Sequence, residues 1–249
     1  MKKIITFFVL LSTHFFVLSQ NPAELENSFN INNLTNVSGG MYAGVRKVGV
    51  QSDGKIFIAG LSNSFNNSFV NKIARLNYDG SLDQTFNFSG VGFNSNAEIL
   101  QFLEQPDGKI LIAGKSISSY NDDSVSGIVR LNSDGTRDIN FVTTGVNSQI
   151  NFVEIQPDGK ILVGGSFTAF NGITSNRLIR LNVDGTTDNT FNIGAGFNNA
   201  VYSIDLLPNN QIIVAGNFTA YNGDATAIRI VKLNSDGTRD ASFATQFGP

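Results

Sequence analysis

The sequence predicts an all-β protein built from about four repeats of about 50 residues. Three observations lead to this prediction: one motif recurs at a regular interval, a second motif follows each copy at the same interval, and no stretch between them has a helical pattern. The first motif, QPDGKILVGG in its clearest form, begins at Gln51, Gln105, Gln156 and, in a degraded copy, Leu207. The second, of the form IVRLNSDGTRD, begins at Ile73, Ile128, Leu178 and Ile230. Repetition at this period is typical of stacked supersecondary units.

The first two strands of a unit follow from the pattern around the first motif. Apolar residues lie six, three and one positions before it, as Ile150, Val153 and Ile155 do, which indicates a strand with a one-residue bulge. Pro157-Asp158-Gly159 then has the composition of a tight turn. The run Ile161 to Val163 is apolar at every position, so we expect a strand that is buried on both faces.

The second motif supplies the rest of the unit. A third strand at Leu178 to Leu181 leads into an Asp184-Gly185 hairpin turn, and a short fourth strand is expected to carry Phe191. Four-stranded antiparallel meanders of this length pack radially as blades, so the sequence predicts a β-propeller or a partial propeller. A β-helix is the main alternative, but its coils are shorter and pair in parallel, whereas each unit here has two hairpin turns. The repeats are expected at about residues 41–90, 91–144, 145–195 and 196–244.

The motifs also resemble a known family. QPDGKILVGGSFTAFNG followed by RLIRLNVDGTTDNTFN is similar to the delta-60 repeat, a β-propeller repeat of exported bacterial proteins, often from the Bacteroidetes. Both blocks occur in order in each copy, over about residues 45–244, although the fourth copy lacks the DGK. The resemblance implies a propeller-like fold and an extracellular or cell-surface location, without a common activity.

The N-terminus reads as an export signal. Lys2 and Lys3 precede an apolar run from Ile4 to Leu18, and a cut after Ser19 would leave a repeat domain of residues 20–249. A retained membrane anchor is the alternative, but the run is shorter than the roughly 20 residues that span a bilayer. We therefore expect a secreted or cell-surface protein without a membrane span after cleavage.

The count of strands bears on ring closure. LENSFN, residues 25–30, matches LDQTFN at residues 82–87, so the chain has five candidate fourth strands for four units. This favours a partial propeller, incomplete at the C-terminus, over a closed four-bladed ring. An open arc leaves free edges, which are expected to pair with further blades or with another chain.

Composition excludes several functions. After signal cleavage, 15 basic residues stand against 20 acidic ones, a net charge of about −5, which does not favour a nucleic-acid partner. The only histidine leaves with the signal and there is no cysteine, so a Ser-His-Asp triad, a thiol nucleophile and a histidine-ligated zinc are excluded. No cofactor is expected.

The Asp-Gly turns, such as NSDGTRD from Asn132, resemble calcium loops in their spacing of oxygen ligands. A basic residue stands two positions before the Asn in every copy, and a cation there would repel calcium. We therefore expect no metal, and instead an Asx-type turn whose basic residue pairs with a downstream aspartate. The basic residues are Arg75, Arg130, Arg180 and Lys232, and the aspartates are Asp83, Asp138, Asp188 and Asp240.

Two sets of residues are candidates for a ligand site. The first is the aromatic-Asn pair after each middle strand, in which the rings could stack on sugars, although packing between blades is the favoured interpretation. Its candidate residues are Tyr120, Phe170, Asn171, Tyr221 and Asn222. The second set is Glu154 and Asp205, at one equivalent position in neighbouring units, with Glu104 as a further departure from the repeat. Paired carboxylates are the groups that a glycosidase uses.

The sequence thus predicts a secreted, non-enzymatic scaffold or binding module for a protein or glycan at the cell surface. The alternative is a carbohydrate-active hydrolase that uses Glu154, Asp205 or Glu104.

Overall fold

The computed structural model describes residues 44–243 apart from 62, 66 and 67. Within these residues the chain is all-β, and every strand pairing is antiparallel, as a propeller requires and a β-helix does not. The predicted signal at residues 1–19 and the spare fourth strand at residues 25–30 lie outside the described part. In that described part no helix is long and apolar enough to cross a bilayer.

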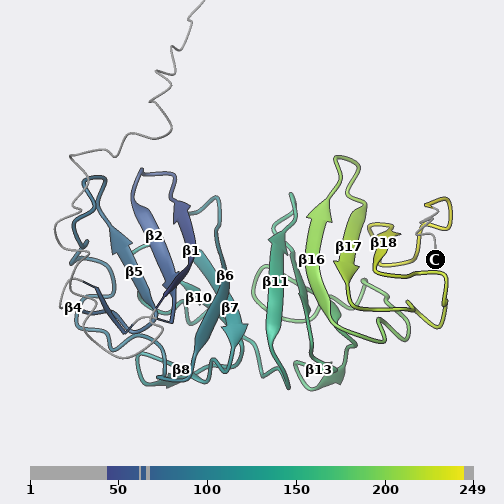
Figure 1. Cartoon of the computed structure of the whole chain (residues 1–249), viewed down its shortest axis with the longest axis horizontal. Coiled ribbons are helices and arrows are strands. Elements are labelled where there is room, and N and C mark those ends of the chain that lie inside the picture. Colours follow the sequence, from purple (N-terminus) through teal and green to yellow (C-terminus); the bar gives the residue numbers. More distant parts are fainter. Residues whose placement is uncertain (1–43, 62, 66–67, 244–249) are drawn as a thin grey trace, which may run out of the picture.

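Four three-stranded sheets form the four blades (Figure 1). Blade 1 consists of β1 (Val45–Val50), β2 (Ile56–Gly60) and β5 (Ile73–Leu76), and blade 2 of β6 (Glu98–Glu104), β7 (Ile110–Lys115) and β10 (Ile128–Leu131). Blade 3 consists of β11 (Ile150–Ile155), β12 (Ile161–Gly165) and β15 (Leu178–Leu181), and blade 4 of β16 (Val201–Leu206), β17 (Ile212–Gly216) and β18 (Ile230–Leu233). In each blade the middle strand follows the QPDGK-type motif, as predicted.

Small hairpins stand at the rim of the first three blades, between the middle and third strands. They are β3 (Ser64–Phe65) with β4 (Ser68–Phe69), β8 (Ser119–Tyr120) with β9 (Asp123–Ser124), and β13 (Ala169–Phe170) with β14 (Ile173–Thr174). In blade 4 a single bridge from Tyr221 to Asp224 takes this place.

The short fourth strand that the sequence predicts is reduced to one bridge per blade, which corrects that expectation. Leu181 bridges Thr187, and the chain then turns at once. The cause is Asp188: its carboxylate accepts the Thr190 amide, and its carbonyl accepts the Phe191 amide, so the chain closes a turn where a strand would extend. The same bridge occurs at Leu76, Leu131 and Leu233.

The predicted bulge is confirmed in all four blades. In blade 3 the register of β11 on β12 shifts between Ile150 and Phe152, and the other three inner strands shift at the equivalent place. Gly165 makes this close approach possible, because a Cβ there would lie 2.3 Å from the Gln149 carbonyl oxygen. Gly60, Gly114 and Gly216 have the same close contact in the other middle strands, so the bulge requires a glycine opposite it in each blade.

The cores lie between consecutive blades. Val153 and Ile161 of blade 3 pack with Leu111 of blade 2, whereas Leu162 faces the other way and packs with Ile204 of blade 4. The middle strands β7 and β12 are buried from their first residue to Gly114 and Gly165, which confirms the predicted burial on both faces. In the end blades, β2 and β17 alternate between buried and half-buried residues because each has a neighbouring blade on one side only.

The blades follow one another in an open arc rather than a closed ring. Blade 1, in purple and blue, and blade 4, in green and yellow, lie at opposite ends of the long axis (Figure 1). Over the described residues the chain is thus a partial propeller.

Candidate functional site

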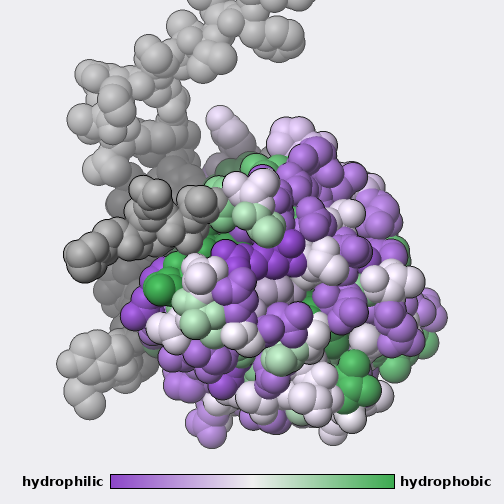
Figure 2. All heavy atoms as spheres, turned by 90° about the vertical axis from the view of Figure 1, so that its right-hand side faces the viewer, coloured by the Kyte–Doolittle hydropathy of each residue, from purple (hydrophilic) through white to green (hydrophobic). Residues whose placement is uncertain are grey.

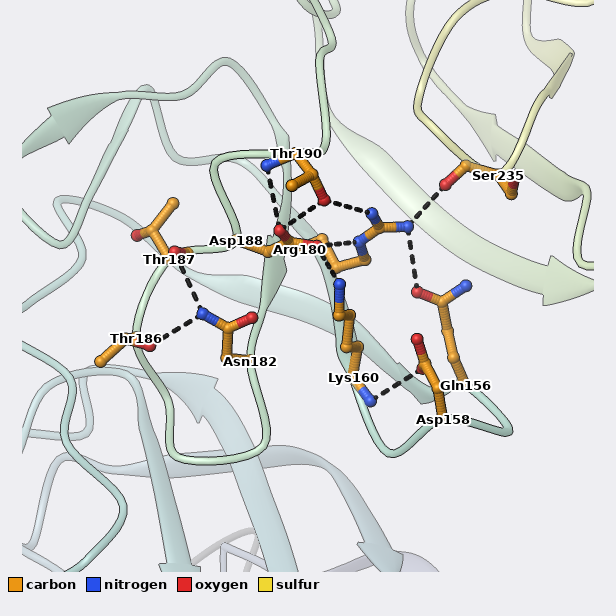
Figure 3. Close-up of polar contacts among 10 residues, drawn as sticks. All are labelled: Gln156, Asp158, Lys160, Arg180, Asn182, Thr186, Thr187, Asp188, Thr190 and Ser235. Carbon is orange, nitrogen blue, oxygen red and sulfur yellow. Dashed lines mark hydrogen bonds and ion pairs between the residues drawn. The ribbon is translucent and has the colours of Figure 1, made fainter.

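A polar cluster that recurs in the blades lies on the strand and turn residues of the two motifs (Figure 3). In blade 3, Oδ2 of Asp188 accepts Nε of Arg180 at 2.6 Å and Nζ of Lys160 at 2.9 Å. Its Oδ1 accepts the amide and hydroxyl of Thr190. Arg180 and Asp188 are buried. Every oxygen of this buried carboxylate thus has a partner, as a buried charge requires.

The same cluster recurs, which confirms the predicted pairing of a basic residue with the downstream aspartate. Arg75 with Asp83, Arg130 with Asp138 and Lys232 with Asp240 are ion pairs within their own blades. Lys55 and Lys109 occupy the place of Lys160. In blade 4 the lysine is replaced by Gln211, which donates to Asp240 at 3.0 Å.

The arginine also joins consecutive blades. Nη1 of Arg180 donates to the carbonyl oxygen of Ser235, in the Asp-Gly turn of blade 4, at 2.5 Å (Figure 3). Arg75 and Arg130 make the equivalent bonds to Ser133 and Val183. The guanidinium of Arg180 also lies 4.5 Å from the ring centroid of Phe191. These residues therefore hold the frame together and leave no free charge for chemistry.

The electrostatics of the cluster keep the aspartates ionised. Burial alone would raise the pKa of Asp188, but the hydrogen bonds from Lys160, Thr190 and Arg180 outweigh it and hold this pKa well below its usual range. The pKa of Asp83 is lowered against burial in the same way, by Lys55, Thr85 and Arg75. A carboxylate fixed in this state cannot serve as a general acid near neutral pH.

The turn aspartates that resemble calcium ligands have partners within their own turns. Oδ1 of Asp134 accepts both the amide and the hydroxyl of Thr136 at 2.9 and 2.7 Å, and Asp184 with Thr186 repeats the arrangement. In the part of the chain that the structure describes, no group of three or more His, Cys, Asp or Glu is arranged to hold a metal. The geometry is that of an Asx turn.

The structure places the aromatic candidates Tyr120, Phe170 and Tyr221 in the core between blades, where a sugar could not stack on them. The hydroxyl of Tyr120 donates to the Gly135 carbonyl oxygen at 2.5 Å, and Tyr221 does the same to Gly237. In blade 3, where the ring is Phe170, Nδ2 of Asn171 donates to the equivalent Gly185 at 3.0 Å. Asn222 has a positive φ and accepts the Ala195 amide, so it shapes the chain at the rim.

The carboxylate candidates separate into two cases. Glu104 accepts both the amide and the hydroxyl of Ser52, in the first turn of blade 1, at 2.8 and 2.9 Å, so it joins blades. Glu154 of β11 and Asp205 of β16 lie on strands of consecutive blades that are in contact; burial first, and the charge of Asp205 second, raise the pKa of Glu154.

One surface feature was missed from the sequence. Phe69 and Phe88 border an open hollow of about 300 Å³ on blade 1, and they are 70% and 82% exposed. Blade 2 has Ser124 and Thr143 at these two positions, and blade 3 has Thr174 and Ile193. The hollow itself recurs on blade 3, at about 210 Å³, without the two rings. A comparison of the repeats at positions outside the two motifs could have found this pair.

The repeat architecture defines a β-propeller protein. The chain belongs to the family described as "Domain of unknown function (DUF5122) beta-propeller", whose model matches residues 51–86, 105–141, 156–191 and 207–243, more than half of the chain. Each match runs from the first motif to the phenylalanine after the second. Among curated proteins, none matches the sequence.

Several solved structures have similar arrangements of strands. A protein of unknown function from Bacteroides caccae has a TM-score of 0.45 and 13% identity, with 80% of this chain and 67% of that chain covered. The extracellular domain assigned to a one component system of B. thetaiotaomicron has a TM-score of 0.48 and 20% identity, with 85% and 23% covered. A streptogramin B lyase has a TM-score of 0.45 and 18% identity, with 70% and 49% covered. Likenesses at this level are not evidence of a shared function.

Proposed function

We propose that the chain is an exported, non-enzymatic binding module in which a rigid blade frame presents a ligand site on blade 1. The single observation that carries the proposal is the pair of exposed rings, Phe69 and Phe88, on one hollow. Exposed apolar rings that border a hollow mark an interaction site. The apolar run at residues 4–18 and the resemblance to delta-60 repeats support export to the cell surface.

The lining of the hollow fits a neutral glycan. Besides the two rings it presents the hydroxyl and amide groups of Ser68, Gln84 and Ser89. Its charged residues, Arg75 and Asp83, neutralise each other in an ion pair. Aromatic faces beside uncharged hydrogen-bonding groups suit the apolar faces and hydroxyls of a pyranose.

A glycan array followed by titration calorimetry of the best ligand tests this proposal. Replacement of both rings by the residues of blade 2, F69S with F88T, should weaken binding about tenfold or more, because both stacking faces are lost. Ile139→Thr removes an apolar side chain that is equally exposed on blade 2 and should leave the affinity unchanged. An array without any bound glycan would leave a protein ligand as the surviving form of the proposal, and glycan binding that ignores F69S/F88T would remove the site.

A hydrolase that uses Glu154 and Asp205 is the second candidate. The raised pKa of Glu154 beside a second carboxylate favours it, since a glycosidase acid needs such a shift. Hydrolysis of a panel of glycans by the parent chain and by the variants E154Q and D205N tests this candidate. Turnover by the parent chain that both variants abolish would establish the enzyme, whereas absent or unchanged turnover rejects it.

A further inference from the structure

Blade 1 exposes an apolar face whose counterparts in the other blades are largely buried. We call it the leading face; it consists of Val45, Val48 and Val50 of β1 with Ile56 and Ile58 of β2. The three valines are 57%, 61% and 74% exposed, and the two isoleucines are half-buried. At the equivalent positions of the next blade, Ile99, Phe102, Ile110 and Ile112 are buried against blade 1. The leading face therefore has the composition of an interface between blades, although no described blade covers it.

Blade 4 has the complementary surface at the other end of the arc. Its trailing face consists of Ile213 and Ala215 of β17 with Ile230 of β18, all half-buried. The equivalent residues of blade 3, Leu162 and Leu178, are fully buried under blade 4. Figure 2 views the molecule from this end and shows apolar patches between polar residues. Aliphatic residues are thus kept where the next blade would pack.

We propose that the leading face of blade 1 is covered by the trailing face of blade 4 from a second copy of this chain. All three junctions within the chain join a leading face to a trailing face, so the repeat itself specifies this contact and its orientation. The two faces belong to blades that lie at opposite ends of the long axis, so they do not meet within one copy (Figure 1). The contact is heterologous, in the sense that each copy uses a different surface.

The basic residue beside the trailing face indicates a reversible contact. In blades 1 to 3 the arginine of the third strand reaches the turn of the next blade, as Arg180 reaches Ser235. Blade 4 has Lys232 instead, and its ammonium group is bound to Asp240 at 2.7 Å. The carbonyl that an arginine there would reach in the second copy is that of Tyr78. A lysine whose single ammonium group is bound to an aspartate has no further nitrogen that corresponds to Nη1 of the arginine. We therefore expect the intermolecular junction to be weaker than the internal ones.

Sedimentation equilibrium of the purified chain and four variants, one of them a control, tests the proposal. The parent chain should associate with increasing concentration. Val48→Glu on the leading face and Ile213→Glu on the trailing face should each remove association, and a mixture of the two should restore a heterodimer, because each retains the face that the other lacks. Lys232→Arg should lower the dissociation constant about threefold to tenfold. Val142→Glu, at an exposed position of blade 2 away from both faces, is the matched control and should associate as the parent does.

The outcomes separate clearly. A parent chain that stays monomeric at its solubility limit overturns the proposal, and so does a folded mixture of V48E and I213E without a heterodimer. Association that V48E removes but I213E leaves intact would indicate that two leading faces meet, which also overturns it. If circular dichroism shows that I213E does not fold, the effect of K232R decides: tighter association supports the contact and unchanged association contradicts it. None of these results depends on Phe69, Phe88 or a glycan.

Discussion

Arg180 forms an ion pair with Asp188 in its own blade and, with the other branch of the same guanidinium, a 2.5 Å hydrogen bond to the carbonyl oxygen of Ser235 in the next. One side chain thus fixes both the turn of its blade and the position of the following blade. The recurrence of this arginine in three blades explains why the second motif is so regular. The arginine recurs in these repeats because it joins each blade to the next.

Replacement of Arg180 tests its double role. Arg180→Lys should keep the pair with Asp188, as Lys232 does with Asp240, and lose the bond to Ser235, at a cost of about 1 to 2 kcal/mol in the free energy of unfolding. Arg180→Ala should cost about 3 to 5 kcal/mol because it leaves a buried carboxylate short of a cation. Urea unfolding measures both. Arg137→Lys, in an exposed pair with Asp123, is the control and should change stability by less than about 0.5 kcal/mol; equal effects at the two sites would contradict the account.

The ionisation of Asp188 should make its contribution depend on pH. The folded protein lowers the pKa of this carboxyl, so the contribution is fully present above the unfolded pKa of about 3.9 and is lost as the pH falls below that value. The difference in unfolding free energy between the parent and Asp188→Asn should therefore be larger at neutral pH than at a pH near 3. Urea unfolding at both pH values gives the two differences, and a difference that does not change with pH would refute the assignment.

Ser52 and Glu104 are two departures from the repeat that depend on each other. Proline takes the place of Ser52 in the other three blades, and it has no amide hydrogen for a carboxylate to accept. Ser52→Pro and Glu104→Ile, each a change to the residue of blade 3, should both be destabilising alone, by about 0.5 to 1.5 kcal/mol. The double variant should recover most of the loss, with a coupling energy of about 1 kcal/mol in a double-mutant cycle. Strict additivity would show that the pair is not coupled.

The two glycines that end β12 should differ in their tolerance of a methyl group. A Cβ at Gly165 would meet the backbone oxygen of Gln149 at 2.3 Å, whereas one at Gly164 would meet the side chains of Val201 and Ile204 at 2.6 and 3.0 Å. Side chains can rotate away more easily than the backbone of a bulge can move. We expect Gly164→Ala to cost about 1 to 3 kcal/mol and Gly165→Ala to cost more. Thermal unfolding ranks the two, and the reverse order would be inconsistent with the bulge as described.

Much of the frame could be predicted because it depends on patterns of residues that are close together in the sequence. The inner strand with its bulge, the tight turn at Pro157 and the doubly buried β12 each depend on residues close in sequence. The pairing of Arg180 with Asp188 could be predicted for the same reason. The prediction of a short fourth strand is wrong because Asp188 and Thr190 close a turn that competes with an extended chain. Side-chain hydrogen bonds within a turn outweigh a short apolar pattern here.

The site was harder to predict because its residues meet only when the blades assemble. Ser52 and Glu104 are in different repeats, and only the packing of β6 on blade 1 brings them together. Tyr120 and Phe170 have the ring type of a sugar site but lie in the core, and exposure cannot be read from a repeat. Phe69 and Phe88 differ from the other copies at positions outside both motifs, where a comparison of motifs does not reach.

We infer that the repeated residues build the frame and that blade 1 carries the ligand site. This inference is tested most directly by calorimetric titration of the glycan selected on the array against F69S/F88T and Arg180→Lys in parallel. F69S/F88T should lose about tenfold or more in affinity with an unchanged midpoint of thermal unfolding, whereas Arg180→Lys should lower that midpoint and keep the affinity. Parental affinity in F69S/F88T, together with weakened binding by folded Arg180→Lys, would contradict it.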